Sequence, residues 1–427
     1  MTDAPICFSL ARLDPLETRS LAERQAAWEV ALPAQVRAAQ AVPALAQLLA
    51  GVDAAQVTTT AALAQLPVTR KHELLHRQQA LRGSDAFGGF SALGWSMQRS
   101  LRPARRVFQS PGPLYEPEGW ASDYWRSARA LRAAGFTAGD LVHNSFSYHL
   151  TPGAWIMEGG AHALGCTVFP GGVGNTELQL QAMGHLRPDG YTGTPSFLRI
   201  LLEKAAESGL ALPSLKKALL SGEAFPPSLR DWLQARGVAG YQAYATADVG
   251  VIAFETTARQ GLVVDEGVLV EIVRPGTGIV LPDGEVGEVV VTVFNPDYPL
   301  VRFGTGDLSA VLLGPCPTGR SHMRIQGWMG RADQTAKVRG MFVHPGQIAE
   351  VIKRHPEVTK ARLVVAGEMA NDSMTLHVET FSTDPALADA VANSMRDVTK
   401  LRANVVVAAP GALKNDGKVI DDTRSYA

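Results

Sequence analysis

The chain has 427 residues, of which 46% are hydrophobic and 19% charged, and its formal net charge is -1. This length exceeds what one hydrophobic core ordinarily supports, so two or more domains are expected. The near-neutral balance excludes the strongly basic surface that nucleic acids and anionic membranes attract, and it favours small molecules as partners.

The three cysteines, Cys7, Cys166 and Cys316, lie far apart and form no CxxC pair. This spacing excludes a disulfide framework and a structural zinc site. The N-terminal stretch lacks the basic region of a secretory signal, and no run of roughly 18 to 20 apolar residues predicts a membrane span. We therefore expect a cytoplasmic protein that binds neither nucleic acid nor membrane; whether it is a homodimer is left open.

The first predicted elements form a helical layer over residues 17–80. From about residue 120, helical and strand patterns alternate at a spacing typical of βαβ units, which predicts mainly parallel sheets. The helices are expected at 123–136, 153–165, 197–209 and 229–237, and the strands at 141–146, 166–172 and 216–222.

Beyond residue 250 the pattern changes to strand runs joined by turn residues, at 261–273, 278–294 and 301–313. Such turns predict an antiparallel sheet. A last unit begins near residue 330 and reads as helix, two strands, helix and strand, which is an α+β arrangement of ordinary domain size.

A glycine-bracketed aspartate stands in the string FGTGDL (303–308), after a predicted strand. On a tight turn, the carboxylate of Asp307 accepts two hydrogen bonds from a diol; an aspartate that merely caps the turn is the alternative. Two more strings follow in order, GRADQTAKVRGMFVHPGQI (330–348) and PGALKNDGKV (410–419), the second with Lys418 in a glycine-flanked segment.

This ordered set resembles the acyl-adenylate-forming superfamily and, within it, the phenylacetate–coenzyme A ligase family. Three further stretches are similar to parts of that family: its aryl-pocket region (145–181), its Thr-Pro-Ser strand end (191–201) and its adenine-binding Gly-Glu segment (219–230). The resemblance covers nearly all of 65–427.

Together with the residue patterns, the resemblance implies an α/β fold with two domains. A large AMP-binding domain (1–331) holds mainly parallel sheets and an antiparallel part, and a small α+β domain (332–427) moves about a hinge at Asp333. The implied adenine contacts are lining by Gly222, Glu223 and Ala224 and stacking by Tyr244. The resemblance also implies that Asp307 binds the ribose, that Arg331 assists at the ribose or phosphate, and that Lys418 bridges the substrate carboxylate and the α-phosphate. A cation suits that bridge because the reaction brings two anions together.

The chain departs from the family where the triphosphate loop is expected, at Ser110–Pro117 (SPGPLYEP). Ser110 and Gly112 match, but the loop lysine becomes Glu116, and two prolines remove backbone donors. Glutamates at 116 and 118 therefore either hold Mg²⁺ or indicate that the terminal phosphates are not gripped here. A plain surface loop is the alternative.

The second departure is YATADVG (244–250), where the family's magnesium glutamate becomes the shorter Asp248 and a hydroxyl residue becomes Ala247. A carboxylate of either length is a hard oxygen ligand for Mg²⁺, so Asp248 is the predicted catalytic metal ligand. Thr246 is a candidate for supplying the missing hydroxyl.

An aromatic cluster beside small residues predicts a pocket for an aryl or modest apolar acid. Its candidates are Phe146, Tyr148, His149 and Gly153, although core packing explains each aromatic alone. The resemblance implies an ATP-dependent carboxylate–CoA ligase that acts through an acyl-adenylate, with ATP, Mg²⁺ and coenzyme A. Two alternatives stay open: another acyl acceptor, or a nucleotide- or acyl-binding homologue whose triphosphate loop is impaired.

Overall fold

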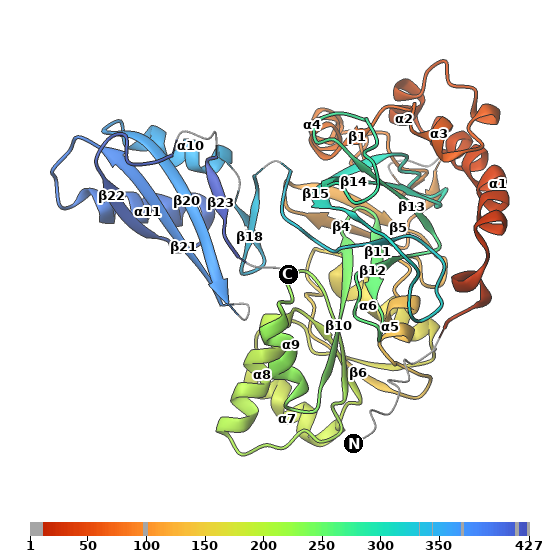
Figure 1. The fold of residues 1–427 in the computed structure, drawn as a ribbon, viewed down its shortest axis with the longest axis horizontal. Helices are drawn as coiled ribbons and strands as arrows, with labels where there is room; N and C mark the ends of the chain where they lie inside the picture. Colours follow the sequence, from red (N-terminus) through yellow and green to blue (C-terminus); the bar gives the residue numbers. More distant parts are fainter. Residues whose placement is uncertain are drawn as a thin grey trace. The chain divides into compact units, whose positions relative to one another are not determined.

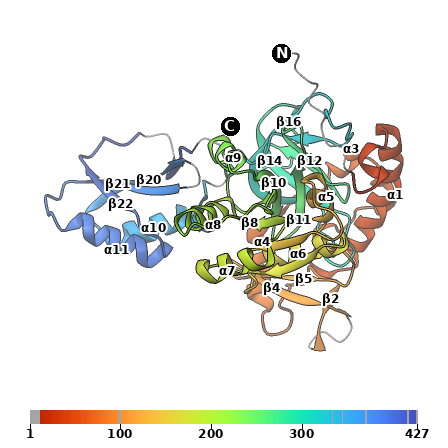
Figure 2. The same cartoon turned by 90° about the horizontal axis from the view of Figure 1, so that it is seen from below.

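The computed structural model describes residues 12–96, 101–332, 334–343, 345–368, 371–414 and 418–424. The chain divides into two compact units (Figures 1 and 2). The first comprises Met1–Gly222 and Leu233–Trp328, and the second comprises Glu223–Trp232 and Met329–Ala427. Within the described residues, no helix combines the length and the apolar character that crossing a bilayer requires.

A nine-stranded sheet organises the first unit, and it joins the predicted parallel strands to antiparallel strands that the alternating patterns did not place in the same sheet. Its parallel half runs in the spatial order β7 (Thr167–Pro170), β6 (Leu141–Asn144), β8 (Gly190–Gly193), β9 (Lys217–Leu220) and β10 (Ala239–Thr246). Antiparallel strands extend it with β11 (Gly250–Glu255), β12 (Leu262–Val264), β17 (Arg324–Ile325) and β16 (Val311–Leu312).

Helices follow the parallel strands in sequence, as in other α/β proteins. They are α5 (Ala128–Ala133), α6 (Gly153–Ala163), α7 (Thr176–Leu186), α8 (Pro195–Glu207) and α9 (Pro227–Gln234). Helices α5 and α6 share a buried apolar core with β9, β10 and β11. The first is shorter than the predicted 123–136, because Asp123 and Arg126 adopt left-handed backbone conformations and the Asp123 carboxylate accepts the N–H groups of Ser127 and Ala128.

A second sheet of the first unit has the order β1 (Thr69–Arg70), β15 (Phe303–Ser309), β14 (Gly287–Val293) and β13 (Val268–Val273). The predicted N-terminal helical layer is present as α1 (Leu21–Gln40), α2 (Pro43–Leu48), α3 (Thr60–Leu63) and α4 (Lys71–Leu81), with 3-10 turns at Pro15–Thr18 and Ala54–Gln56. Buried leucines and valines of α1 and α2 share one core with β13 and β14, and these helices stand together in red in Figure 1.

Two small pairs of strands complete the first unit. One is parallel, β2 (Leu93–Gly94) with β3 (Arg102–Pro103). The other is the antiparallel hairpin of β4 (Arg106–Ser110) and β5 (Leu114–Glu118), which contains the stretch where the triphosphate loop is expected.

The second unit contains the α+β arrangement that the sequence predicts. Its four-stranded sheet has the order β22 (Asn404–Ala408), β21 (Asn371–Thr380), β20 (Val358–Glu368) and β23 (Ile420–Asp422), and β18 (Ala336–Val338) pairs with β19 (Met341–Val343). Helices α10 (Pro345–Arg354) and α11 (Leu387–Thr399) bury their apolar residues in a core shared with this sheet.

Candidate active site

The carboxyl ends of β6, β9 and β10 lie at one edge of the nine-stranded sheet, because these strands run parallel. Ligands of open α/β sheets bind at this edge. Predicted site residues follow each strand: Phe146 and Tyr148 follow β6, Gly222 follows β9, and Asp248 follows β10. The topology therefore brings together segments that lie about 100 residues apart in the chain.

Asp307 and Tyr244 come from different sheets, and their side chains form a hydrogen bond. The Tyr244 hydroxyl donates to Asp307 Oδ2 at 2.8 Å and approaches Thr305 Oγ1 at 3.2 Å. Asp307 lies within β15 and not on the predicted turn; the β14–β15 register shifts between Glu288 and Val290, and Gly306 adopts a φ of 73°. This bulge re-aims the carboxylate, as bulges beside active sites commonly do.

Trp328 is a partner of Asp307 that no sequence motif indicated. Its indole Nε1 donates to Asp307 Oδ1 at 2.9 Å, so each carboxylate oxygen accepts one bond from an aromatic side chain. Asp307 is 8% exposed, and this arrangement holds it in one orientation.

The predicted phosphate segment is a strand hairpin with a buried carboxyl group inside it. Glu116 is completely buried, and Ser110 Oγ donates to its Oε1. Burial, together with the charge of Asp248, raises the pKa of Glu116 to about 8. Gly112 separates the two strands with a φ of 155°, a conformation that favours glycine.

Asp248 lies in the turn between β10 and β11 and is 3% exposed. Lys71 Nζ contacts its Oδ2 at 2.9 Å. Lys71 is the first residue of α4, and sequence reasoning missed it because only the fold brings position 71 to position 248. The hydroxyl of Thr246 accepts the Val249 N–H at 3.3 Å, so it takes part in the turn.

Three of the four predicted acyl-pocket residues are associated with α6. The Tyr148 hydroxyl donates to Glu158 at 2.7 Å, and its ring meets Trp155 edge-on at 5.1 Å. Burial and the bond to Glu158 raise the pKa of Tyr148. Phe146 covers Gly153, where an added Cβ would lie 3.6 Å from the Phe146 ring. His149, the fourth, is exposed on the connecting loop.

The remaining predicted residues that the structure describes belong to the second unit. The predicted hinge, Asp333, lies outside the described residues. Glu223 and Ala224 precede α9, and Arg331 is half-buried. Lys418 lies two residues before the start of β23, and its Nζ contacts Asp421 Oδ1 at 3.1 Å with 55% of the side chain exposed. The Lys418 carbonyl accepts a bond from Arg362 at 3.2 Å, which anchors the backbone of this segment.

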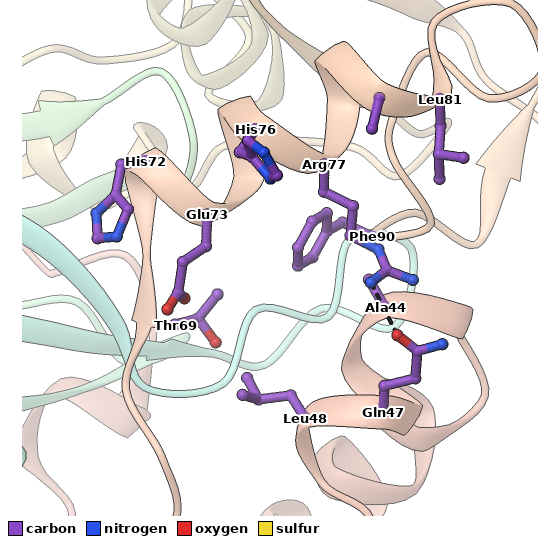
Figure 3. A pocket seen from close by; sticks show the side chains of 11 residues that line it. Ala44, Gln47, Leu48, Thr69, His72, Glu73, His76, Arg77, Leu81 and Phe90 are labelled. Carbon is purple, nitrogen blue, oxygen red and sulfur yellow. Dashed lines mark hydrogen bonds between the residues drawn. The ribbon is translucent and has the colours of Figure 1, made fainter.

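A cleft of about 730 Å³ lies between α2 and α4 (Figure 3). His72, Glu73 and His76 line it with the spacing of a His-Glu-x-x-His zinc motif, which sequence reasoning also missed. Among the described residues, no three His, Cys, Asp or Glu side chains come close enough to hold a metal ion. Glu73 instead accepts the Arg70 N–H at 2.9 Å in a helix cap, so the motif has a structural explanation.

Residues 124–293 match the family model described as AMP-binding enzyme. The phenylacetate–coenzyme A ligase of Pseudomonas putida is 32% identical, over 86% of this chain and 84% of the relative. That of Aromatoleum evansii is also 32% identical, over 77% and 74%. The chain belongs to the phenylacetate–coenzyme A ligase family.

A third member of the phenylacetate–coenzyme A ligase family, from Thermus thermophilus, is 35% identical over 59% of both chains. Among solved structures, 2-hydroxyisobutyryl-CoA ligase in complex with 2-HIB-AMP and CoA superposes with a TM-score of 0.78, covering 96% of this chain and 92% of that one at 24% identity. The amide bond synthetase McbA from Marinactinospora thermotolerans has a TM-score of 0.55 at 18% identity, over 76% and 71%. These two solved structures share the fold of this chain.

Proposed function

We propose that this protein is an ATP-dependent carboxylate–CoA ligase that forms an acyl-adenylate and then a thioester with coenzyme A. Membership of the phenylacetate–coenzyme A ligase family supports this reaction class. The observation that carries it is Asp307, a buried carboxylate that hydrogen bonds from Tyr244 and Trp328 hold in one orientation, since a carboxylate is the acceptor that a ribose diol requires. An aryl or small apolar acid suits the aromatic residues near α6.

The two reactions call for a mobile small domain. We assign residues 1–331 to a large AMP-binding domain and 332–427 to a small domain that rotates about Asp333. Lys418 supports this assignment. Its side chain is exposed on the second unit, and its backbone carbonyl is held by a hydrogen bond from Arg362. In adenylation its ammonium would lie between the carboxylate and the α-phosphate, where it stabilises the charge that develops.

Asp248 supports a divalent cation at the phosphate end, where Mg²⁺ would neutralise phosphate charge when bound. Its Oδ1 is buried and has no hydrogen-bond partner among the described residues, and hard oxygen ligands of this kind suit Mg²⁺. Gly222, Glu223 and Ala224 are assigned to the adenine lining and Arg331 to the ribose or phosphate.

A second candidate function is nucleotide or acyl binding without ligation. It is favoured by one observation, the hairpin in which Glu116 is buried where the family has a lysine. Transfer of the acyl group to an acceptor other than coenzyme A is the third candidate.

Pyrophosphate release from ATP, measured over a panel of aryl and short-chain acids with and without coenzyme A, separates these functions. The ligase releases pyrophosphate with its acid and forms the thioester only with coenzyme A. Release without thioester formation identifies another acceptor. No release with any acid, while AMP still binds, identifies the binding homologue.

A further inference from the structure

Two buried carboxyl groups belong to the proposed phosphate end of the site, one from the β4–β5 hairpin and one from the turn after β10. Glu116 is 0% exposed and Asp248 is 3% exposed, and each acts electrostatically on the other. One oxygen of each group is engaged, by Ser110 Oγ and by Lys71 Nζ respectively. The other two, Glu116 Oε2 and Asp248 Oδ1, are buried with no hydrogen-bond partner in the described part of the chain.

Such an arrangement is costly for the protein alone. Buried polar atoms are nearly always hydrogen-bonded, and a buried carboxyl group is stable only when it is paired, bound to a metal or protonated. Protonation of Glu116 removes its charge, but its Oε2 still has no hydrogen-bond partner among the described residues. Lys71 supplies one ammonium group for two carboxyl groups. The hydroxyl of Tyr298 is also buried and has no hydrogen-bond partner among the described residues. Burial, and then the charges of Asp248 and Glu116, raise the pKa of Tyr298. A further cation would satisfy this cluster.

The neighbouring glutamate of the same strand is already satisfied. Glu118 pairs with Arg106 at 3.0 and 3.1 Å through its two carboxylate oxygens. Of the two glutamates on β5, only Glu116 has a buried oxygen atom among those that lack a partner. The structure thus distinguishes the two glutamates, which the sequence alone left equivalent.

We propose that Glu116 and Asp248 together bind one divalent cation, with Mg²⁺ as the physiological ion. Mg²⁺ typically uses one or two protein carboxylates and completes its shell with water and substrate phosphates, so two carboxylates suffice. The ion then supplies a positive charge at the hairpin, where Glu116 stands in place of the lysine that the family resemblance implies. Its role toward a nucleotide rests on the proposed ligase function; the binding of the ion itself does not.

Mn²⁺ titration of the full-length, nucleotide-free protein, followed by electron paramagnetic resonance, tests the site. The wild-type chain should bind one Mn²⁺. Glu116→Gln keeps the size of the side chain and an acceptor for Ser110, and it should weaken Mn²⁺ binding at least 10-fold. Glu118 lies two residues further along the same strand and is paired with Arg106. Glu118→Gln is therefore the matched control and should bind Mn²⁺ as the wild type does.

Circular dichroism of each variant checks that the fold is intact, and Glu116→Asp replaces Glu116→Gln if that variant does not fold. Glu116→Asp shortens the reach by one methylene and should also weaken binding. Equal Mn²⁺ affinity in wild type and the Glu116 variant, or absence of bound Mn²⁺ in the wild type, overturns the proposal. Because no acid, ATP or coenzyme A is present, Glu116-dependent binding stands even if pyrophosphate release later refutes the ligase function.

Discussion

The two ends of the candidate nucleotide site differ in how far they follow their family. At the nucleoside end, Asp307 stands in its expected string and is held by two aromatic donors. At the proposed phosphate end, the β4–β5 hairpin contains the buried Glu116, where the family resemblance implies a lysine. In the proposed site, the electrostatics change at one end while hydrogen-bond geometry is kept at the other, because separate strands supply the two ends.

The largest effect is expected from Lys418, the cation that we propose lies between the substrate carboxylate and the α-phosphate. Lys418→Ala should reduce acyl-AMP formation on the order of 100-fold to 1,000-fold, because a charge that stabilises the transition state is lost. Thioester formation from supplied acyl-AMP should be spared. Single-turnover assays of each half-reaction provide the measurement.

Lys414→Ala, an exposed lysine of the same segment, is the control for that variant and should leave both half-reactions unchanged. Equal loss of the two half-reactions in Lys418→Ala would argue against a role confined to adenylation.

The next effect concerns the nucleoside end. Asp307→Asn keeps the shape of the side chain but removes its charge and one acceptor. Since a hydrogen bond to a charged group contributes roughly 1.5–3 kcal/mol, kcat/KM for ATP should fall on the order of 100-fold. Steady-state pyrophosphate release measures it, with the exposed Asp283→Asn as control. An unchanged kcat/KM would mean that the nucleoside end is not where ATP binds.

Tyr244→Phe removes the hydroxyl that positions Asp307 and keeps the ring. We expect a loss of about 10-fold in kcat/KM for ATP, carried mainly by KM, because one bond to a charged carboxylate is lost. Tyr241→Phe on the same strand serves as the comparison and should have no such effect. If both variants behave alike, the Tyr244–Asp307 bond has no part in nucleotide binding.

The smallest effect tests how completely the phosphate end has changed. Thr246→Val keeps the side-chain shape and removes the hydroxyl that accepts the Val249 N–H. We expect kcat/KM for ATP to change less than about 2-fold and stability to fall by roughly 1 kcal/mol or less. A kinetic loss of 10-fold or more would show instead that this hydroxyl serves the phosphates in place of Ala247, and the two ends would then differ less.

The strand and helix alternation of the fold was predictable because apolar periodicity records it directly. The parallel strands before residue 250 and the C-terminal α+β arrangement were predicted, but the addition of antiparallel strands to the same sheet was not. The predicted helix at 123–136 was too long, because left-handed residues before Ala128 cannot be read from apolar spacing. The pairing of β1 with β15 joins segments more than 230 residues apart, which no local pattern indicates.

The candidate site was predictable where residues stand in ordered strings. Asp307 and Tyr244 were both named from the sequence, and the fold places them in contact. Lys71 and Trp328 were not, because their contacts with Asp248 and Asp307 exist only through tertiary structure. Glu116 was recognised as a departure, but its complete burial and its unpartnered oxygen are properties of the hairpin.

The central claim is that this chain keeps a working nucleoside end beside a rebuilt phosphate end. Isothermal titration of AMP, without divalent cations, into the wild type and Asp307→Asn tests it most directly. The account predicts that the wild type binds AMP and that the variant loses at least 10-fold in affinity. Equal AMP affinity in the two proteins, or no AMP binding by the wild type, would contradict it.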